Sequence, residues 1–250
     1  MNSKKLVSIF GLALALVLGV MIFGGRTTRA VAPVCTVGPA GDYTTIQDAV
    51  NDTACTTINV SAGTYNESVT IGRPLILNGP NVGVSAFAPR GPEATVNSAG
   101  TTFNLTDGQN VTIDGFTISG VFGVYPSTST TGLSILNNII SGTSRAVSLD
   151  APGDGASLLN NDLFSNTRSL HIGGGTGPHT NLKINGNRFS GPLASTGIFF
   201  SGTCLAVAPH AGVNGNKKCN CGSEKKRTGC CCQNKFYAEP RFNLLVNVLF

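Results

Sequence analysis

Two arginines at matching positions of the chain could bind an anionic ligand. Arg145 and Arg168 stand 23 residues apart, each directly after a hydroxyl residue, and His171 follows shortly after the second arginine. Guanidinium groups bind carboxylates and sulfates through pairs of parallel hydrogen bonds. We therefore interpret Arg145, Arg168 and His171 as a candidate ligand-binding patch for a uronate-containing or sulfated glycan. The alternative is two solvated arginines that splay apart or pair with Asp150 or Asp162.

The carboxylates form no pattern that indicates catalysis or a strong metal site. No two of them recur at one repeat spacing on the same face, so no residues are apparent that could perform the paired-carboxylate chemistry of glycoside hydrolases. Asp150 and Asp154 share a loop that could hold calcium, but two carboxylates alone make a weak site and the same residues form an ordinary turn. We predict no catalytic residues, no metal and no cofactor, with calcium as an unsupported option.

These residues lie within a repeat that predicts the fold. Four segments share an apolar residue followed by Asp or Asn: VTIDGFTISG from Val111, LSILNNIISG from Leu133, SLLNNDLFSN from Ser157 and LKINGNRFSG from Leu182. The Asp or Asn positions are 23, 23 and 25 residues apart. A short and regular period is typical of a solenoid, in which each repeat contacts its neighbours.

Each repeat holds short runs with apolar residues at every second position, which indicates strands. One coil cannot bury its inner face, so coils must stack, at about 4.8 Å, with their inner side chains in a column. We predict an all-β fold, a right-handed single-stranded parallel β-helix over residues 31–203. Arg145 and Arg168 then lie on adjacent coils, and His171 points outward, where we expect it to be exposed.

A column of asparagines is predicted to support one turn of every coil. Asparagine tolerates a left-handed backbone, and its amide can bond to the amide one coil above. Asp114 takes the place of asparagine at one rung. The predicted ladder is structural and consists of Asn78, Asp114, Asn137, Asn160 and Asn185. The insertion 82–93 is predicted to leave the coils.

The segment before the first repeat predicts a cover for the open end of the solenoid. Residues 44–47 have the form of a capping box, and apolar residues at 46, 49 and 50 share one helical face, so we predict an N-terminal capping helix. Cys35 and Cys55 flank this helix. We predict that, in an oxidising compartment, they form a disulfide worth about 3 kcal/mol by chain entropy.

The helix sequence IQDAV from Ile46, with AGTYNESVTI and VTIDGFTI, resembles the pectin-lyase-like right-handed β-helix proteins of bacterial surfaces. The resemblance covers residues 42 to about 202. It implies the architecture and leaves the chemistry open, since such proteins include lyases, glycosidases, epimerases, adhesins and modules without catalysis. Lyases of this kind place several Asp around calcium beside a basic residue, and the hydrolases carry paired Asp with Gly-His-Gly and Arg-x-Lys. Neither set occurs in this chain.

The first thirty residues predict export. Lys4 and Lys5 precede an apolar run over 6–23 and a small-residue exit at Ala30, which is the layout of a signal peptide over 1–30. The run is also long enough for an uncleaved membrane anchor. We expect a secreted or cell-surface protein.

Charge is divided unevenly along the chain. The segment 31–203 has six Lys and Arg against ten Asp and Glu, whereas 204–250 has seven against two. A nucleic-acid-binding domain would need a basic face with aromatic residues, so we predict no nucleic-acid partner for the acidic body. The possible partner is an acidic polysaccharide, and contact with a membrane is expected only through an uncleaved anchor.

The tail over 204–250 departs from the repeat. Six of its residues are cysteines, scattered among basic residues without inward alternation. The spacing of these cysteines matches no common zinc-binding pattern. A disulfide-stapled cap over the last coil is a second interpretation. The favoured interpretation is a frameshifted or misjoined segment that replaces further coils, or a disordered one.

Three classes of function remain. The favoured class is an exported polysaccharide-binding or surface-display module that has no identifiable catalytic residues. The rival is a polysaccharide lyase, in which Arg145 or Arg168 acts beside a sugar carboxylate. The third is a structural stalk or adhesin.

Overall fold

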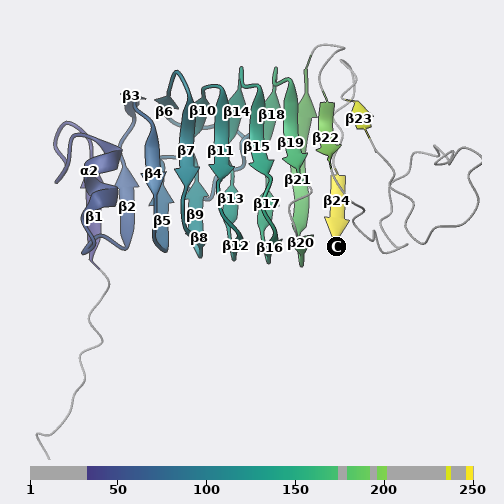
Figure 1. Cartoon of the computed structure of the whole chain (residues 1–250). Coiled ribbons are helices and arrows are strands. Elements are labelled where there is room, and N and C mark those ends of the chain that lie inside the picture. The colour runs from purple at the N-terminus through teal and green to yellow at the C-terminus, as the bar shows by residue number, and fades with distance from the viewer. Residues whose placement is uncertain (1–32, 174–178, 192–195, 202–234, 238–245, 250) are drawn as a thin grey trace, which may run out of the picture. The chain divides into compact units, whose positions relative to one another are not determined.

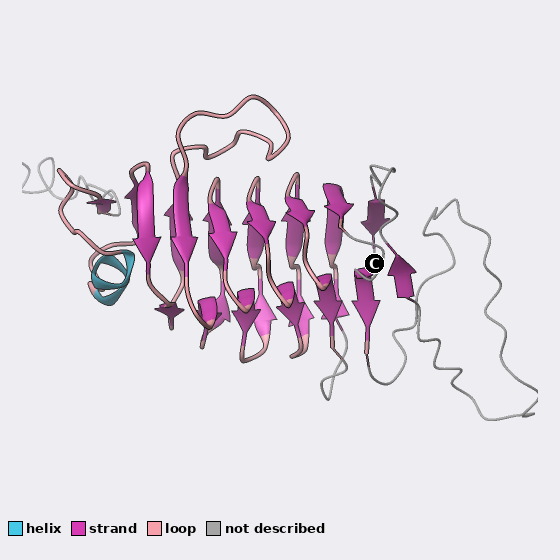
Figure 2. Cartoon of the chain, turned by 90° about the horizontal axis from the view of Figure 1, so that it is seen from above, coloured by secondary structure: helices cyan, strands magenta, loops and turns pink. Residues whose placement is uncertain are grey.

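The computed structural model describes residues 33–173, 179–191, 196–201, 235–237 and 246–249, which belong to the unit Ala32–Phe250. The described residues form a parallel β-solenoid, as the repeat spacing predicts. Figure 1 shows the strands of successive coils side by side, and Figure 2 shows the same stack from above. The predicted signal peptide and most of the tail lie outside the described residues. No helix among the described residues is long and apolar enough to cross a membrane.

Three rows of strands form the faces of the solenoid. Face 1 consists of β1 (Val34–Val37), β2 (Thr57–Val60), β5 (Leu75–Asn78), β9 (Val111–Asp114), β13 (Ser134–Leu136), β17 (Ser157–Leu159) and the first part of β21 (Lys183–Ser190). Face 2 consists of β3 (Gly63–Asn66), β6 (Ala94–Asn97), β10 (Thr117–Ser119), β14 (Ile139–Ser141), β18 (Asp162–Phe164) and the second part of β21. Face 3 consists of β4 (Val69–Ile71), β7 (Thr101–Leu105), β11 (Phe122–Pro126), β15 (Arg145–Leu149), β19 (Arg168–Ile172) and β22 (Thr196–Phe200).

Shorter strands complete the coils. A small fourth row consists of β8 (Gly108–Gln109), β12 (Thr130–Thr131), β16 (Gly153–Asp154) and β20 (His179–Thr180). Two strands of the tail pair antiparallel with the last coil: β23 (Lys235–Tyr237) with β22, and β24 (Val246–Leu249) with β21. The interpretations of the tail otherwise concern residues that the structure does not describe.

The core is a set of columns in which equivalent side chains of successive coils touch. On face 1, Ile113, Ile135, Leu158 and Ile184 are in register and fully buried. The parallel register follows from the repeat, because a shift of one residue would turn every inward side chain toward solvent. Polar side chains at the intervening positions face outward or bond along the turns.

A helix lies beside the first coil. α2 (Ile46–Asn51) buries Ile46, Ala49 and Val50 and contacts β1, β2 and β4. The N-cap is Thr45, whose hydroxyl accepts a bond from the Asp48 backbone amide at 3.1 Å, one residue later than the predicted capping box. This cap satisfies one of the free amides that every helix start leaves.

The predicted disulfide is present. Cys35, in β1, is bonded to Cys55, with a Cα–Cα distance of 5.5 Å. Cys55 is fully buried in the core next to the helix. The bond therefore closes the loop that contains α2 and ties it to the first coil.

The predicted asparagine ladder is paired across coils in part, since Asn78 is in register with Asp114, but the buried ladder lies at other positions. The strand register pairs Asp114 with Leu136, not with Asn137, and pairs Leu159 with Asn185. Asn137 and Asn160 instead have φ of 54° and 56°, so they serve as the left-handed turn residues. Two predicted rungs do bond to a neighbouring coil: the Asn137 amide donates to Asp114 Oδ1 at 2.8 Å, and the Asn78 amide donates to Asn59 Oδ1 at 3.0 Å.

The buried ladder begins one residue after these turns. Asn138, Asn161 and Asn187 are fully buried on successive coils. Asn161 Oδ1 accepts from the Asn138 backbone amide at 2.9 Å, and Asn187 Oδ1 accepts from the Asn161 backbone amide at 2.9 Å. Each side-chain amide also donates to a backbone carbonyl of the preceding coil: Ile113, Ile135 and Leu158 respectively. The left-handed residue turns the chain, which directs the next side chain inward under the turn.

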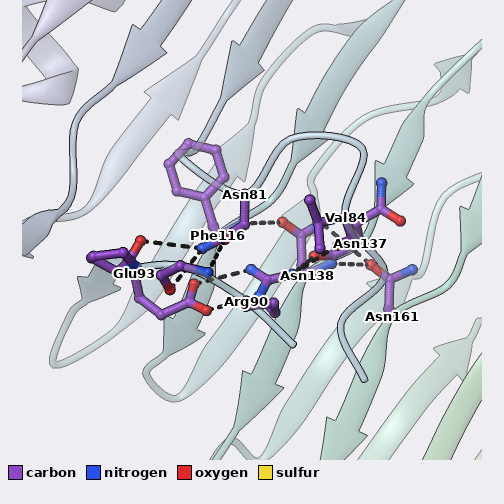
Figure 3. Close-up of polar contacts among 10 residues, drawn as sticks. Asn81, Val84, Arg90, Glu93, Phe116, Asn137, Asn138 and Asn161 are labelled. Carbon is purple, nitrogen blue, oxygen red and sulfur yellow. Dashed lines mark hydrogen bonds and ion pairs between the residues drawn. The ribbon is translucent and has the colours of Figure 1, made fainter. Parts of the chain in front are cut away.

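The insertion at 79–93 folds back over the turns of later coils (Figure 2). Arg90 anchors the insertion, as Figure 3 shows. Its guanidinium donates to both carboxylate oxygens of Glu93, at 2.7 and 3.0 Å, and to the carbonyl of Asn137 at 2.6 Å. The Ala86 backbone amide donates to the Asn160 carbonyl at 3.1 Å. Burial acts to raise the pKa of Glu93, but the hydrogen bonds and charge of Arg90 outweigh it and hold this pKa below its ordinary value.

Arg90→Ala should lower the free energy of unfolding by about 2 kcal/mol, because it leaves Glu93 and the Asn137 carbonyl without their donor. The loss stays below that of a fully buried pair, since the Glu93 side chain is 26% exposed and can regain water. Urea unfolding measures it. Lys183→Ala, which removes an exposed charge, serves as control and should change stability by less than about 0.5 kcal/mol. Equal stability of the two variants would contradict the fastening role of Arg90.

Candidate functional site

Face 3 brings the two predicted arginines together. Arg145 in β15 and Arg168 in β19 are paired in the strand register, and Phe122 in β11 occupies the same position one coil earlier. These three strands lie next to one another in Figure 1. All three side chains are partly exposed. The repeat of 23 residues thus produces one row of outward side chains across three coils.

Each arginine rests on an aromatic ring and not on the other arginine. The Arg145 guanidinium carbon lies 5.5 Å from the centroid of the Phe122 ring, and that of Arg168 lies 4.4 Å from the centroid of Phe199. These are cation–π distances. Each guanidinium thus has an aromatic ring as a neighbour, which offsets part of the repulsion between two like charges on adjacent strands.

The aromatic side chains extend this surface. The rings of Phe122 and Tyr125 lie 5.6 Å apart, and the ring of Phe199 stacks on His171 at 5.2 Å. Phe122, Tyr125 and Phe199 are all partly exposed. We call the set of Phe122, Tyr125, Arg145, Arg168 and Phe199 the arginine–aromatic surface.

Asp150 joins Arg145 to His171. Its Oδ2 lies 2.9 Å from Arg145 Nη1, and its Oδ1 lies 2.6 Å from His171 Nδ1. Arg145 therefore has the partner that the alternative interpretation of the sequence gave it. Asp162, the other candidate partner, is paired with Arg188 instead.

His171 is not exposed, contrary to the prediction. Only 4% of its surface reaches solvent, because Asp150, the Phe199 ring and Ser201 enclose it. Its Nε2 lies 2.8 Å from Ser201 Oγ, and Ser148 Oγ lies 3.2 Å from Nδ1. The outward position of a strand residue does not imply exposure where the next coil supplies a large ring over it.

The environment of His171 disfavours the charged imidazolium. Burial lowers the pKa of His171 below its ordinary 6.5, and the charges of Arg145 and Arg168 act in the same direction, while Asp150 opposes them. Asp150 acts on His171 through its charge: its Oδ1 lies 2.6 Å from Nδ1 but has no hydrogen-bond partner among the described residues, and Nδ1 bonds to Ser148 Oγ. In the tautomer that carries its proton on Nδ1, Nε2 accepts the hydroxyl proton of Ser201.

The loop that could have held calcium has other partners. Asp150 is engaged by Arg145 and His171, and Asp154 Oδ1 accepts bonds from Thr180 at 2.6 Å and Asn181 at 2.8 Å. Hydrogen bonds from these two residues lower the pKa of Asp154. Within the described ranges, no three His, Cys, Asp or Glu side chains gather as a metal site would require.

Sequence reasoning missed Ser201 and the three aromatic residues of face 3. Phe199 could have been found, because strand register places it one coil after His171, in the row that begins at Ser148. Ser201 follows His171 by 30 residues, outside the period of 23, since the last coil contains a longer connection. Counting residues at the period of 23 therefore does not predict that Ser201 lies next to His171.

Comparisons with protein-family models, with curated proteins and with solved structures find no match to this chain. The fold itself defines the class, which is that of the parallel β-helix proteins. The described site adds an outer sheet face with two arginines on aromatic rings, and a buried His171 in contact with Ser201 and Asp150.

Proposed function

We propose that this chain is an exported, pectin-lyase-like β-helix protein of the cell surface or the secreted fraction, and that it binds acidic polysaccharide at the arginine–aromatic surface. The observation that carries the proposal is the register pairing of Arg145 with Arg168, each seated on a ring that remains partly exposed. Neither guanidinium is buried, so both keep donors available to a ligand that lies along the face.

The chemistry of the surface favours a glycan with negative groups. Guanidinium donors bind carboxylates and sulfates in a bidentate manner, and aromatic faces pack against the apolar faces of sugar rings. Arg145 shares its charge with Asp150, whereas Arg168 has no carboxylate partner among the described residues. Arg168 is therefore expected to contribute more to the affinity than Arg145.

The test is binding of the full chain to a uronate polymer, a sulfated polymer and a neutral glucan, measured by retention or calorimetry with and without calcium. Arg145→Ala with Arg168→Ala should weaken binding to the charged polymers by roughly 10- to 100-fold, the loss of one or two charged hydrogen bonds. Lys183→Ala removes a comparable charge from face 1 and should have little effect. Arg168→Lys should restore only part of the affinity.

Three outcomes would overturn the proposal. Equal losses for Lys183→Ala and the arginine variants would indicate nonspecific attraction. Release of unsaturated ends from a uronate polymer would make the protein a lyase. Absence of retention on every polymer would leave a structural stalk or adhesin.

A further inference from the structure

We propose that Ser201, His171 and Asp150 form the nucleophile, the general base and the charge-stabilising carboxylate of a serine hydrolase that cleaves acyl esters. The glycan part of the substrate, an O-acylated polysaccharide, rests on the proposed function. The hydrolase chemistry rests on the geometry of the three residues alone.

His171 lies between Ser201 and Asp150, and Asp150 acts on the imidazole through its charge, because its Oδ1 has no hydrogen-bond partner among the described residues. Ser201 Oγ lies 2.8 Å from Nε2, and Asp150 Oδ1 lies 2.6 Å from Nδ1, on the opposite side of the ring. Such a constellation is recognised by geometry and role and recurs on unrelated folds. The imidazole is enclosed, whereas Ser201 keeps partial exposure through which an ester could approach.

The solenoid itself aligns the three residues. Leu149, Ile172 and Phe200 are paired in register, so Asp150 and Ser201 occupy equivalent positions two coils apart. His171 projects from the coil between them and reaches both. The backbone amide of Ser201 continues the sheet by donating to the Ile172 carbonyl at 2.9 Å, which holds the serine at the end of β22.

Gly173 makes room for the carboxylate. A Cβ at this position would lie 2.7 Å from both Cα and Oδ1 of Asp150, closer than real contacts allow. Any side chain at 173 would push Asp150 away from His171. Gly173 is thus a positioning residue, and its absence of a side chain serves the contact between the carboxylate and the imidazole.

The reaction balances with water as the only co-reactant. Ser201 Oγ attacks the acyl carbon and its proton passes to His171 Nε2. The bond from that carbon to the sugar oxygen breaks, and the proton on Nε2 goes to the leaving hydroxyl. Water then attacks the acyl-serine, its proton passes through Nε2 to Ser201 Oγ, and the carboxylic acid leaves. Asp150 stabilises the imidazolium at each stage, because its charge favours the protonated ring.

The first experiment treats the full chain with a fluorophosphonate, which prefers activated serines to the six cysteines of the tail, and maps the adduct by mass spectrometry. The adduct is expected on Ser201. Ser201→Ala should abolish it, and His171→Gln should slow it by about 100-fold or more, the usual contribution of a general base. Ser190→Ala, in β21 of the same coil, is the control and should label normally.

The pH dependence separates a base from a structural contact. His171 is faced by Asp150, Arg145, Arg168, Ser148 and Ser201. Labelling of wild type should be constant above about pH 7 and should fall as pH drops through the lowered pKa of His171, because only neutral Nε2 accepts the serine proton. A rate that keeps rising toward pH 9 would contradict this role of His171.

The second experiment measures release of p-nitrophenol from p-nitrophenyl acetate and of acetate from an acetylated polysaccharide. Turnover of the small ester that disappears in Ser201→Ala supports the hydrolase even if no polysaccharide binds. Absence of an adduct and of turnover, in a chain whose unfolding matches that of Ser201→Ala, would show that the contacts are structural only and would overturn the proposal. Glycan retention would be unaffected by that result.

Discussion

Asn161→Ala should lower the free energy of unfolding by about 4 kcal/mol, because it removes several buried bonds at once. The Asn161 side chain donates to the Ile135 carbonyl at 2.8 Å and to Asn187 Oδ1 at 2.9 Å, and it accepts from the Asn138 backbone amide at 2.9 Å. Alanine would leave these groups fully buried without partners, and no water can replace the amide inside a packed turn. Urea or thermal unfolding, followed by circular dichroism, measures the loss.

The matched control is the preceding residue. Asn160→Gly keeps the left-handed backbone, with φ of 56°, and removes an exposed side chain, so stability should change by less than about 1 kcal/mol. The pair of variants also decides where the ladder lies. If Asn160→Gly lowers the free energy of unfolding more than Asn161→Ala does, the stabilising ladder lies at the positions that the sequence predicted.

Removal of the Cys35–Cys55 disulfide by replacing both cysteines with alanine should cost about 3 kcal/mol. The bond links residues 20 apart, and the chain-entropy estimate for a loop of this length gives that value. Part of the loss is packing, because the buried Cys55 leaves a small void beside the helix. The measurement is the midpoint of urea unfolding at constant slope.

A reducing agent provides the control for the disulfide. Reduction of wild type should lower the midpoint by most of the amount seen in the double variant, and it should leave the double variant unchanged. If reduction has no effect on wild type while the double variant is destabilised, the loss comes from packing and the chain-entropy account of this bond is wrong.

The sequence alone determined the architecture, because the signal for it is spread over many residues. The period of 23 in the segments from Val111 to Leu182 requires stacked coils, and alternation within each segment requires strands. The disulfide could be predicted as well, since it joins the only two cysteines of the solenoid segment. The register of Arg145 with Arg168 followed from the same period.

The position of the ladder could not be decided by spacing. Asn137 and Asn160 are 23 residues apart, and so are Asn138 and Asn161, so both pairs fit the period equally well. Only the backbone angles distinguish them: the first of each pair turns the chain at positive φ, and the second points inward. A one-residue choice of this kind depends on three-dimensional geometry that composition and periodicity do not encode.

The contacts around His171 depended wholly on the tertiary structure. A repeat predicts which strands are neighbours, but it does not predict which side chain of the next coil covers a given residue. His171 occupies an outward position of its strand, which alone would predict exposure, but Phe199 of the next coil buries it. Ser201 reaches His171 across a connection that breaks the period. Periodicity therefore determined the scaffold, whereas the chemistry of the site was decided where coils of unequal length bring single side chains within bonding distance.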